Sequence, residues 1–213
     1  RMTSILDASE DELARRIRDR LRNSIGLTTP VEWQRLKSLQ TTLEAIRMKS
    51  WDEANKFLSD EAVKLAYQEP IQFDSIVKTI LPVVVETVMP SARFLKQIAL
   101  SRPFEGRILK DWSKTMAADD IRRMHSAIQA GMVAGEDSAT IARRVVGTRT
   151  LKGIDGMTEI SRRQVQAITR TAVQHVSNNA RDAWAEENSD ILTAEQFVAT
   201  LDSRTTAICR ALD

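Results

Sequence analysis

The residues that could do chemistry in this chain are few and lie far apart in the sequence. His125 and His175 are 50 residues apart, and no Cys, Asp or Glu stands beside either at the spacing of a metal site. Cys209 is the only cysteine, and no base lies near it in the sequence. The chain also lacks a nucleophile elbow, a phosphate-binding glycine loop and a zinc-protease helix. We therefore expect structural roles for these residues, and no catalytic site, metal or cofactor in this stretch.

Positive charge is informative only locally. The chain has 31 Lys and Arg against 29 Asp and Glu, so its net charge of +2 does not by itself indicate nucleic acid. Between Ser138 and Arg170, however, basic residues clearly outnumber acidic ones. Such a basic band could follow DNA phosphates or bind an acidic protein surface, although a solvated helix face has the same composition. The candidate contact residues are Arg143, Arg144, Arg149, Lys152, Arg162 and Arg163.

Polar residues near the end of the chain form a third group. On a helical wheel centred on Ala172, Asn179 lies close to the apolar stripe, with the polar residues Thr171, His175, Asn178 and Asp182 on its flank. A half-buried Asn needs hydrogen-bond partners, and the turn containing Asp202 and Arg204 could supply them. We interpret this group as a structural joint between a helix and a strand. A hydrolytic centre with Asp202 as the base is the alternative.

The elements that must position these residues are mainly helices. The chain has only 7 Gly and 5 Pro, and capping-box patterns at Ser9–Glu12, Thr29–Glu32 and Ser50–Glu53 predict three helix starts. Apolar residues then recur every three or four positions, as from Trp33 to Ile46. This pattern predicts a multi-helix bundle.

The middle of the chain is predicted to contain shorter helices. Pro82 and Pro90 bracket a Val-rich run that indicates a kinked or broken helix. The apolar stretch from Ile76 to Met89 is too short for a membrane span and carries charges, so we expect no membrane insertion. Further helices are expected at 108–116, from 119 or 120 to a close at 131–135, and at 138–146.

The last part of the chain is predicted to contain a linker with two glycines, a long helix and a small strand. Gly153 and Gly156 make 148–157 the best linker candidate, and the clearest helix follows, with an apolar stripe from Val165 to Trp184. Alternating β-branched residues at 195–201 predict a small strand. We expect a mainly α fold with minor β at its C-terminal end, divided into an N-terminal helical region (1–70), a central helical region (71–147), the linker and a C-terminal part (158–213).

Two segments of that C-terminal part carry a resemblance. The first is Arg170-Thr171-Ala-Val-Gln-His-Val-Ser-Asn178-Asn179-Ala180-Arg181, and the second is Ala199-Thr-Leu-Asp-Ser-Arg-Thr-Thr-Ala-Ile-Cys-Arg-Ala-Leu-Asp213. Together they resemble the core of the Mu F-like phage head morphogenesis proteins, in which a helix with an Arg-Thr pair and a downstream Asn precedes a strand, an Asp-x-Arg-Thr turn, a Cys and Asp-Gly. The matching residues are Arg170, Thr171, Asn178, Asn179, Asp202, Arg204, Thr205 and Cys209. Weaker likeness is found at Arg102-Pro-Phe-Glu-Gly106, Leu109-Lys-Asp-Trp112 and Ala139-Thr-Ile-Ala142.

The resemblance implies a minor structural protein of a tailed-phage head. Its expected location is the virion, inside the head near the portal vertex, and the host cytoplasm during assembly. The expected partners are the portal protein, other head proteins and packaged double-stranded DNA bound without sequence specificity, with several copies around the portal. The chain starts at Arg1 rather than Met and stops at Asp213, where the family pattern continues to a His and a Cys-rich end. We therefore expect a piece of a longer protein.

Two other functions remain open from the sequence. Residues 121–146 resemble a helix-turn-helix, with Ser138 starting a candidate recognition helix, which would make the chain a sequence-specific DNA-binding protein. That helix offers Arg143 and Arg144 but no Asn or Gln to read adenine. The chain could also be the non-catalytic part of an effector or hydrolase polyprotein, because Mu F-like modules can be joined to effector domains.

Overall fold

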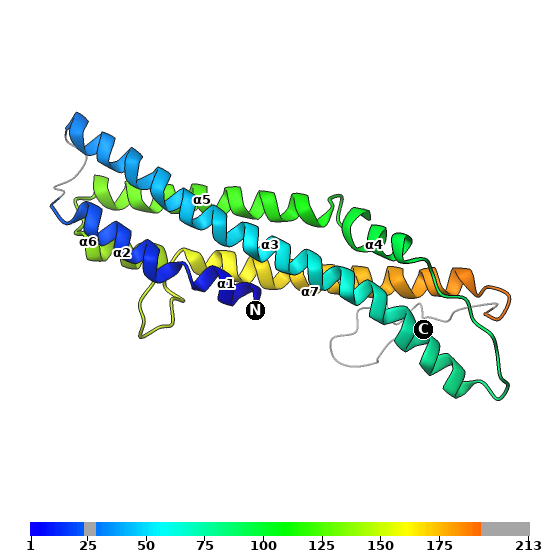
Figure 1. The fold of residues 1–213 in the computed structure, drawn as a ribbon. Helices are drawn as coiled ribbons and strands as arrows, with labels where there is room; N and C mark the ends of the chain where they lie inside the picture. Colours follow the sequence, from blue (N-terminus) through cyan, green and yellow to red (C-terminus); the bar gives the residue numbers. More distant parts are fainter. Residues whose placement is uncertain (24–28, 193–213) are drawn as a thin grey trace, which may run out of the picture.

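The structure, a computed structural model, describes residues 1–23 and 29–192. Within these residues the chain forms an elongated bundle of helices and contains no β-strand beyond an isolated bridge between Phe104 and Arg107 (Figure 1). The prediction of a mainly helical, multi-helix bundle is confirmed. The strand expected at 195–201 lies outside the described residues.

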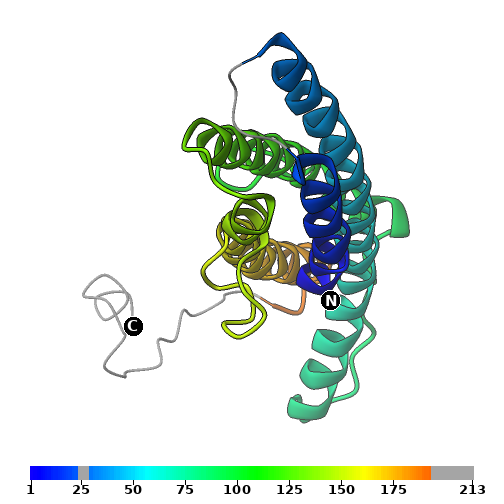
Figure 2. The ribbon, with the colours of Figure 1, turned by 90° about the vertical axis from the view of Figure 1, so that its left-hand side faces the viewer.

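One helix runs along nearly the whole molecule. With 51 residues, α3 is about 75 Å long at the usual rise of 1.5 Å per residue. Figure 2 shows α3 along one side of the bundle, with α5 and α7 packed beside it. The helices are α1 (Met2–Asp7), α2 (Glu10–Leu21), α3 (Pro30–Ile80), α4 (Ala92–Ser101), α5 (Leu109–Val133), α6 (Ser138–Val146) and α7 (Thr158–Glu187).

Of the three predicted capping boxes, only the second is formed. Thr29 accepts from the Glu32 amide and Glu32 accepts from the Thr29 amide, with Pro30 in the first turn. The start predicted at Ser50 is wrong, because the apolar stripe continues through this point and the Ser50 hydroxyl donates to the Ile46 carbonyl of the same helix. Ser9 precedes α2 without a side-chain cap, since its hydroxyl donates to the Leu6 carbonyl.

Two further helix boundaries differ from the prediction. The helices expected at 108–116 and after Asp119 are one helix, α5, because nothing between them breaks the helix and Asp120 is buried rather than capping. The Val-rich run leaves the helix entirely, since α3 ends at Ile80 and residues 81–91 form a non-helical connection. The helix over 138–146 and its end at Gly147 are confirmed.

The core forms two apolar clusters along the bundle. One packs α1, α4 and the N-terminal half of α5 against α7 and the middle of α3. The other packs α2 and α6 against the first third of α3 and the C-terminal half of α5. Helices α3 and α5 take part in both clusters, and α3 continues without a break through residue 70, where a boundary between regions is expected from the sequence. None of the helices in the described part has the length and apolar composition needed to cross a bilayer.

The stripe predicted on α7 is buried from Val165 to Trp184, and the Trp184 ring meets Phe73 edge-on at 5.2 Å between centroids. Trp33, in contrast, was expected on a buried stripe but is 49% exposed on the first turn of α3. The stripe there consists of Leu36, Leu39 and Leu43.

The segment 148–157 joins α6 to α7 as a hydrogen-bonded loop. Gly153 and Gly156 are both buried. The Thr148 amide donates to Asp155 Oδ1 at 2.8 Å, and the Met157 amide donates to the Arg144 carbonyl at 3.1 Å. These bonds fold the loop back on the end of α6 and fix where α7 begins.

Candidate functional site

The family-like residues of α7 lie on one side of the helix, next to the loop that follows α4. Asn179 is half-buried, as its place on the helical wheel predicts. Its Nδ2 donates to the His175 carbonyl at 2.7 Å and lies 3.2 Å from His175 Nδ1. Thr171 donates to the Ala167 carbonyl at 3.3 Å, and Asn178 accepts from Gln174 at 2.8 Å. These hydrogen bonds all join residues four positions apart within α7 itself.

The loop after α4 completes the surface. Arg102 Nη1 donates to Asn179 Oδ1, and the Phe104 ring lies against the His175 ring with 5.3 Å between centroids. Phe104 is itself buried and held by a backbone pair with Arg107. Arg102 is thus a partner of Asn179 that sequence reasoning did not assign. The partners proposed from sequence, Asp202, Arg204, Thr205 and Cys209, lie outside the described residues.

These residues border an open hollow of about 540 Å³, which we call the α7 hollow. It is lined by Phe104, Arg170, Thr171, Gln174, His175, Asn178 and Asn179. Burial and, second, the Arg102 charge lower the pKa of His175 below its ordinary value of 6.5. With Nδ1 assigned as acceptor from Asn179, the proton of the neutral imidazole lies on Nε2, which is buried.

The chemistry available in the α7 hollow is hydrogen bonding. It offers amide and hydroxyl groups, one exposed guanidinium and an imidazole, and no nucleophile there is bonded to a base. Nowhere in residues 1–23 and 29–192 do three His, Cys, Asp or Glu side chains gather in a way that could hold a metal ion.

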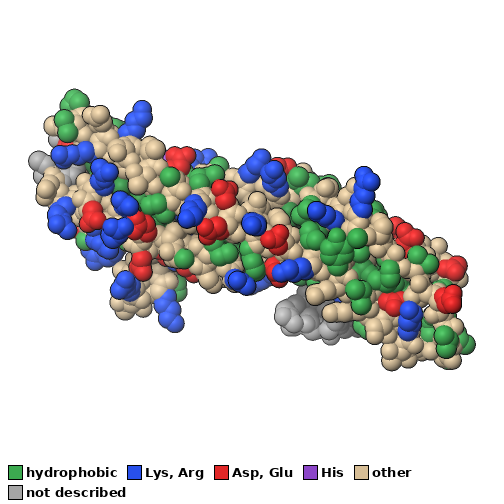
Figure 3. Space-filling model, viewed as in Figure 1, with side chains coloured by type: hydrophobic (Ala, Val, Ile, Leu, Met, Phe, Trp, Pro, Cys, Tyr) green, Lys and Arg blue, Asp and Glu red, His purple; other side chains and the backbone are tan. Residues whose placement is uncertain are grey.

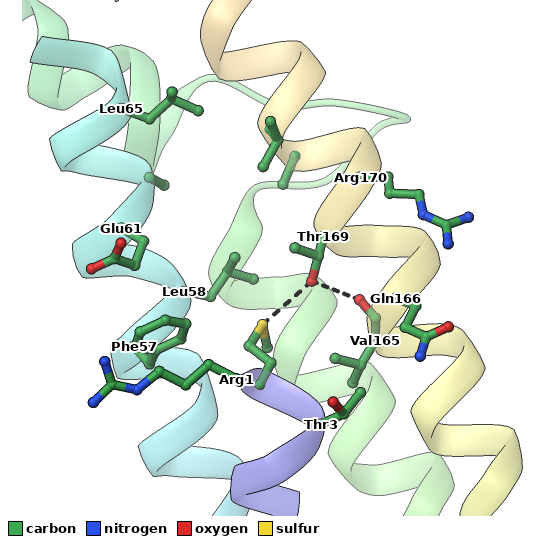
Figure 4. A pocket seen from close by; sticks show the side chains of 14 residues that line it. Arg1, Thr3, Phe57, Leu58, Glu61, Leu65, Val165, Gln166, Thr169 and Arg170 are labelled. Atoms are coloured by element: carbon green, nitrogen blue, oxygen red, sulfur yellow. Dashed lines mark hydrogen bonds between the residues drawn. The ribbon is translucent and has the colours of Figure 1, made fainter. Parts of the chain in front are cut away.

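A second hollow of about 460 Å³ lies between α1, α3 and α7 (Figure 4). Its lining is mainly apolar, with Phe57, Leu58 and Val165 among the side chains that border it. Thr169 donates to the Val165 carbonyl at 2.7 Å and contacts Met2 Sδ at 3.4 Å. The Arg1 guanidinium lies 5.2 Å from the centre of the Phe57 ring. Thr169 and Arg1 are thus engaged with the protein itself, whereas Thr3, Gln166 and Arg170 also border the hollow.

The basic band predicted from sequence is largely paired with acidic residues. The Arg162 side chain is only 13% exposed and forms ion pairs with Asp7, Glu10 and Glu159. It holds the start of α7 against α1 and α2 instead of facing solvent. Arg163 also binds Glu159.

The remaining members of the band are exposed but mostly paired as well. Arg144 binds Glu136, and Arg149 lies 3.2 Å from Asp11. Arg143 donates to the Thr140 hydroxyl at 3.1 Å. Lys152 is exposed at the tip of the loop. These pairs neutralise much of the charge that the sequence alone attributes to this stretch.

A basic surface that sequence reasoning missed lies on α2. Its first turn is acidic, whereas its second half is basic, and α2 packs closely against α6. Figure 3 shows Lys and Arg side chains gathered at this end of the molecule. The arginines of this basic end are Arg15, Arg16, Arg18, Arg20 and Arg22. Arg15 and Arg16 both bind Glu12, and Arg22 lies 4.0 Å from Asp19. The numbers of basic and acidic residues in the whole chain nearly balance, so they do not reveal this surface. The change from acidic to basic residues along α2 was, however, visible in the sequence.

The candidate helix-turn-helix is part of the bundle. Its first helix is the end of α5, which is 25 residues long. Ile141, Ala142 and Val145 bury one side of α6 against α2 and α5. Arg143 and Arg144 remain on the exposed side.

A buried ion pair lies between the two apolar clusters, and sequence reasoning missed it. Arg47 Nε is 2.5 Å from Asp120 Oδ2, and both side chains are 1% exposed. Asp120 also accepts from Trp51 Nε1 at 2.8 Å and from the Ser161 hydroxyl at 2.6 Å. Arg47 Nη1 donates to the Leu6 carbonyl at 2.9 Å. These bonds tie together α1, α3, α5 and α7.

Comparisons of the chain with protein-family models, with curated proteins and with solved structures found no match. No family is shown by them. The resemblance therefore stands on the residues named above.

Proposed function

We propose that this chain is a minor structural protein of a tailed-phage head that docks at the portal and acts in head assembly and in DNA packaging or ejection. The observation that carries the proposal is the contact between Arg102–Gly106 and α7. Both segments resemble Mu F-like proteins independently, although they are far apart in the sequence. The Arg102–Asn179 hydrogen bond and the Phe104–His175 ring contact join them into one surface. That juxtaposition supports one shared role for the two segments.

The α7 hollow fits docking of a polypeptide better than catalysis. Its amides and hydroxyl can bond backbone groups of a partner, and Arg170 can meet a carboxylate. Such groups give orientation and specificity without activating a bond. We therefore assign this surface to the portal or to another head protein, and we propose no enzymatic activity for it.

The basic end fits contact with packaged DNA. Arg18, Arg20 and Arg22 are exposed at the end of α2, and Arg143 is exposed on α6, the helix that packs against α2. Arg18 and Arg22 lie on the same flank of the helix and Arg20 on the other flank, and such arginines neutralise phosphates but do not read bases. The contact we propose is therefore independent of sequence.

Anisotropy titrations with two unrelated DNA duplexes of equal length test the DNA contact. We expect similar, weak affinities for both and a steep loss with salt. Replacing Arg18, Arg20 and Arg22 together by Gln should reduce the slope of log affinity against log salt by about 2–3. The matched control replaces Arg93, Lys96 and Lys110, which are exposed on α4 and α5, and should leave the slope unchanged.

Two results would count against the DNA contact. Binding that survives high salt would exclude a phosphate contact of this kind. Sequence-selective binding that disappears in the variant Arg143→Ala plus Arg144→Ala would favour the helix-turn-helix alternative instead.

A further inference from the structure

A third hollow, of about 440 Å³, lies at the basic end of the molecule, where side chains from the end of α2 and from the second turn of α3 come together. Leu21 of α2 and Leu36 of α3 are both buried in the apolar cluster in which these two helices pack. Arginines stand next to both leucines in the sequence and are held near one another at the surface. Among the described residues, the lining of this arginine hollow is Asp19, Arg20, Arg22, Asn23 and Arg35.

The arginine hollow has positive charge that the protein neutralises only in part. Within the described residues, Arg22 is the one arginine of the lining with an ion pair, to Asp19 at 4.0 Å. The two side chains of this pair are 77% and 52% exposed, so solvent screens their attraction. Three arginines against one aspartate leave a net charge of +2 on the described lining. Guanidinium groups gathered in this way repel one another, and a bound anion would remove that repulsion.

The lining also limits the chemistry of the anion. Among the described residues, no apolar or aromatic side chain borders the arginine hollow, so a nucleotide base would have nothing to stack on. Guanidinium groups bind phosphate oxygens in pairs of parallel hydrogen bonds. A phosphate group also offers more oxygens to several arginines than a carboxylate, which has two. These groups therefore favour a phosphate that is bound through its oxygens alone.

We propose that the arginine hollow binds a phosphate group of the DNA backbone. The DNA contact then has one fixed point, at which Arg20, Arg22 and Arg35 hold a phosphate by paired hydrogen bonds. Arg18 and Arg143, which do not line the arginine hollow, contribute charge alone. That the phosphate belongs to DNA rests on the proposed function, whereas the preference for phosphate follows from the lining itself.

Substitutions that keep the charge test this proposal in anisotropy titrations with a DNA duplex. Arg20→Lys and Arg35→Lys should each weaken binding at least about fivefold, because lysine cannot form the paired hydrogen bonds. Arg18→Lys is the matched control. Arg18 is also exposed on α2 but lies outside the arginine hollow, so binding should change by less than about twofold. Equal effects of Arg35→Lys and Arg18→Lys would overturn the phosphate site and leave a contact through charge alone.

Asp19 gives a test in the opposite direction. Asp19→Asn removes a negative charge from the lining and releases Arg22, so DNA binding should become about two- to fivefold tighter. Asp11→Asn is the control, because Asp11 is exposed on the same helix and pairs with Arg149 outside the arginine hollow. A gain for Asp11→Asn as large as that for Asp19→Asn would count against a phosphate bound at this place.

Inorganic phosphate separates the site from its proposed source. In an NMR titration of the arginine Nε–H signals at constant ionic strength, Arg20, Arg22 and Arg35 should shift with saturation and Arg18 should not. Equal shifts of all four, or equal shifts with sodium acetate, would overturn the phosphate site even if the chain binds DNA. Phosphate-specific shifts in a chain that binds no DNA would overturn DNA as the source, and with it the DNA contact of the proposed function.

Discussion

At the scale of single residues, the most informative feature is the ion pair of Arg47 and Asp120. Each occupies a position on the apolar stripe of its helix, where Arg47 follows Leu43 and Asp120 precedes Ile121. A charge on a buried stripe was a visible signal in the sequence. The pairing itself was not predictable, because it depends on how α3 and α5 are aligned along each other. Opposite charges at such positions select one alignment of the two helices, since any shift leaves a buried charge without a partner.

Replacing one member of this pair should destabilise the protein strongly. Asp120→Ala leaves the Arg47 guanidinium buried without its counter-charge, so we expect a loss of about 3–5 kcal/mol in the free energy of unfolding. The matched control is Asp119→Ala, which breaks a surface pair with Arg122 and should cost at most about 1 kcal/mol. Urea unfolding measures both.

The double variant Arg47→Met plus Asp120→Leu completes this test. Because no charge is left buried, the double variant should be more stable than either single variant. A loss for Asp120→Ala no larger than that for Asp119→Ala would show that the pair is not buried as described.

His175 should make stability depend on pH. Its pKa is lowered in the folded protein, so protonation favours the unfolded chain. The stability that the neutral ring contributes is present above the ordinary pKa of 6.5 and is lost as the pH falls through the lower, folded-state value. In His175→Gln, the free energy of unfolding should therefore change less between pH 7.5 and pH 5 than in the wild type. Chemical denaturation at both pH values measures this, with Gln174→Ala as a control that should keep the wild-type pH dependence.

At the scale of elements, the sequence predicted best where periodicity is long and unbroken. The stripe from Val165 to Trp184 fits a single helical face, and α7 forms as expected. Local start signals were less reliable. Ser50 and Asp119 carry the residue types of helix caps, yet both lie inside helices, because the core buries the stripe on each side of them and helix propagation costs less than a new start. The polar surface around Asn179 was predicted in part. The half-burial of Asn179 follows from the helical wheel, but the contact between Asn179 and Arg102 depends on how α4 packs against α7.

The loop between α6 and α7 makes a prediction about Gly156. A Cβ at this position would lie 2.2 Å from the Gly147 amide nitrogen and 2.4 Å from the Val146 carbonyl carbon, both backbone atoms that cannot move alone. Gly156→Ala should therefore cost about 1–3 kcal/mol through displacement of the loop. Ile154→Ala, at a position that is 60% exposed in the same loop, should stay within about 0.5 kcal/mol of the wild type. Equal melting temperatures for the two variants would show that the loop is loosely packed.

At the scale of the whole molecule, the two ends differ in kind. The end formed by α2 and α6 carries exposed arginines, whereas the opposite end carries exposed apolar side chains at the end of α3, and the α7 hollow lies between them. An elongated scaffold with separate basic, polar and apolar surfaces suits a protein that contacts several partners at once. Composition predicted the helices but not this separation, because the two charge signs nearly cancel over the full sequence.

The proposed role of this chain, a component of a tailed-phage head at the portal, can be tested in purified particles. The experiment is quantitative mass spectrometry with the portal protein as internal reference. The proposed function predicts that the chain is present in few copies per particle and stays with the portal when heads are disrupted gently. Particles that package DNA normally but contain none of this chain would contradict it.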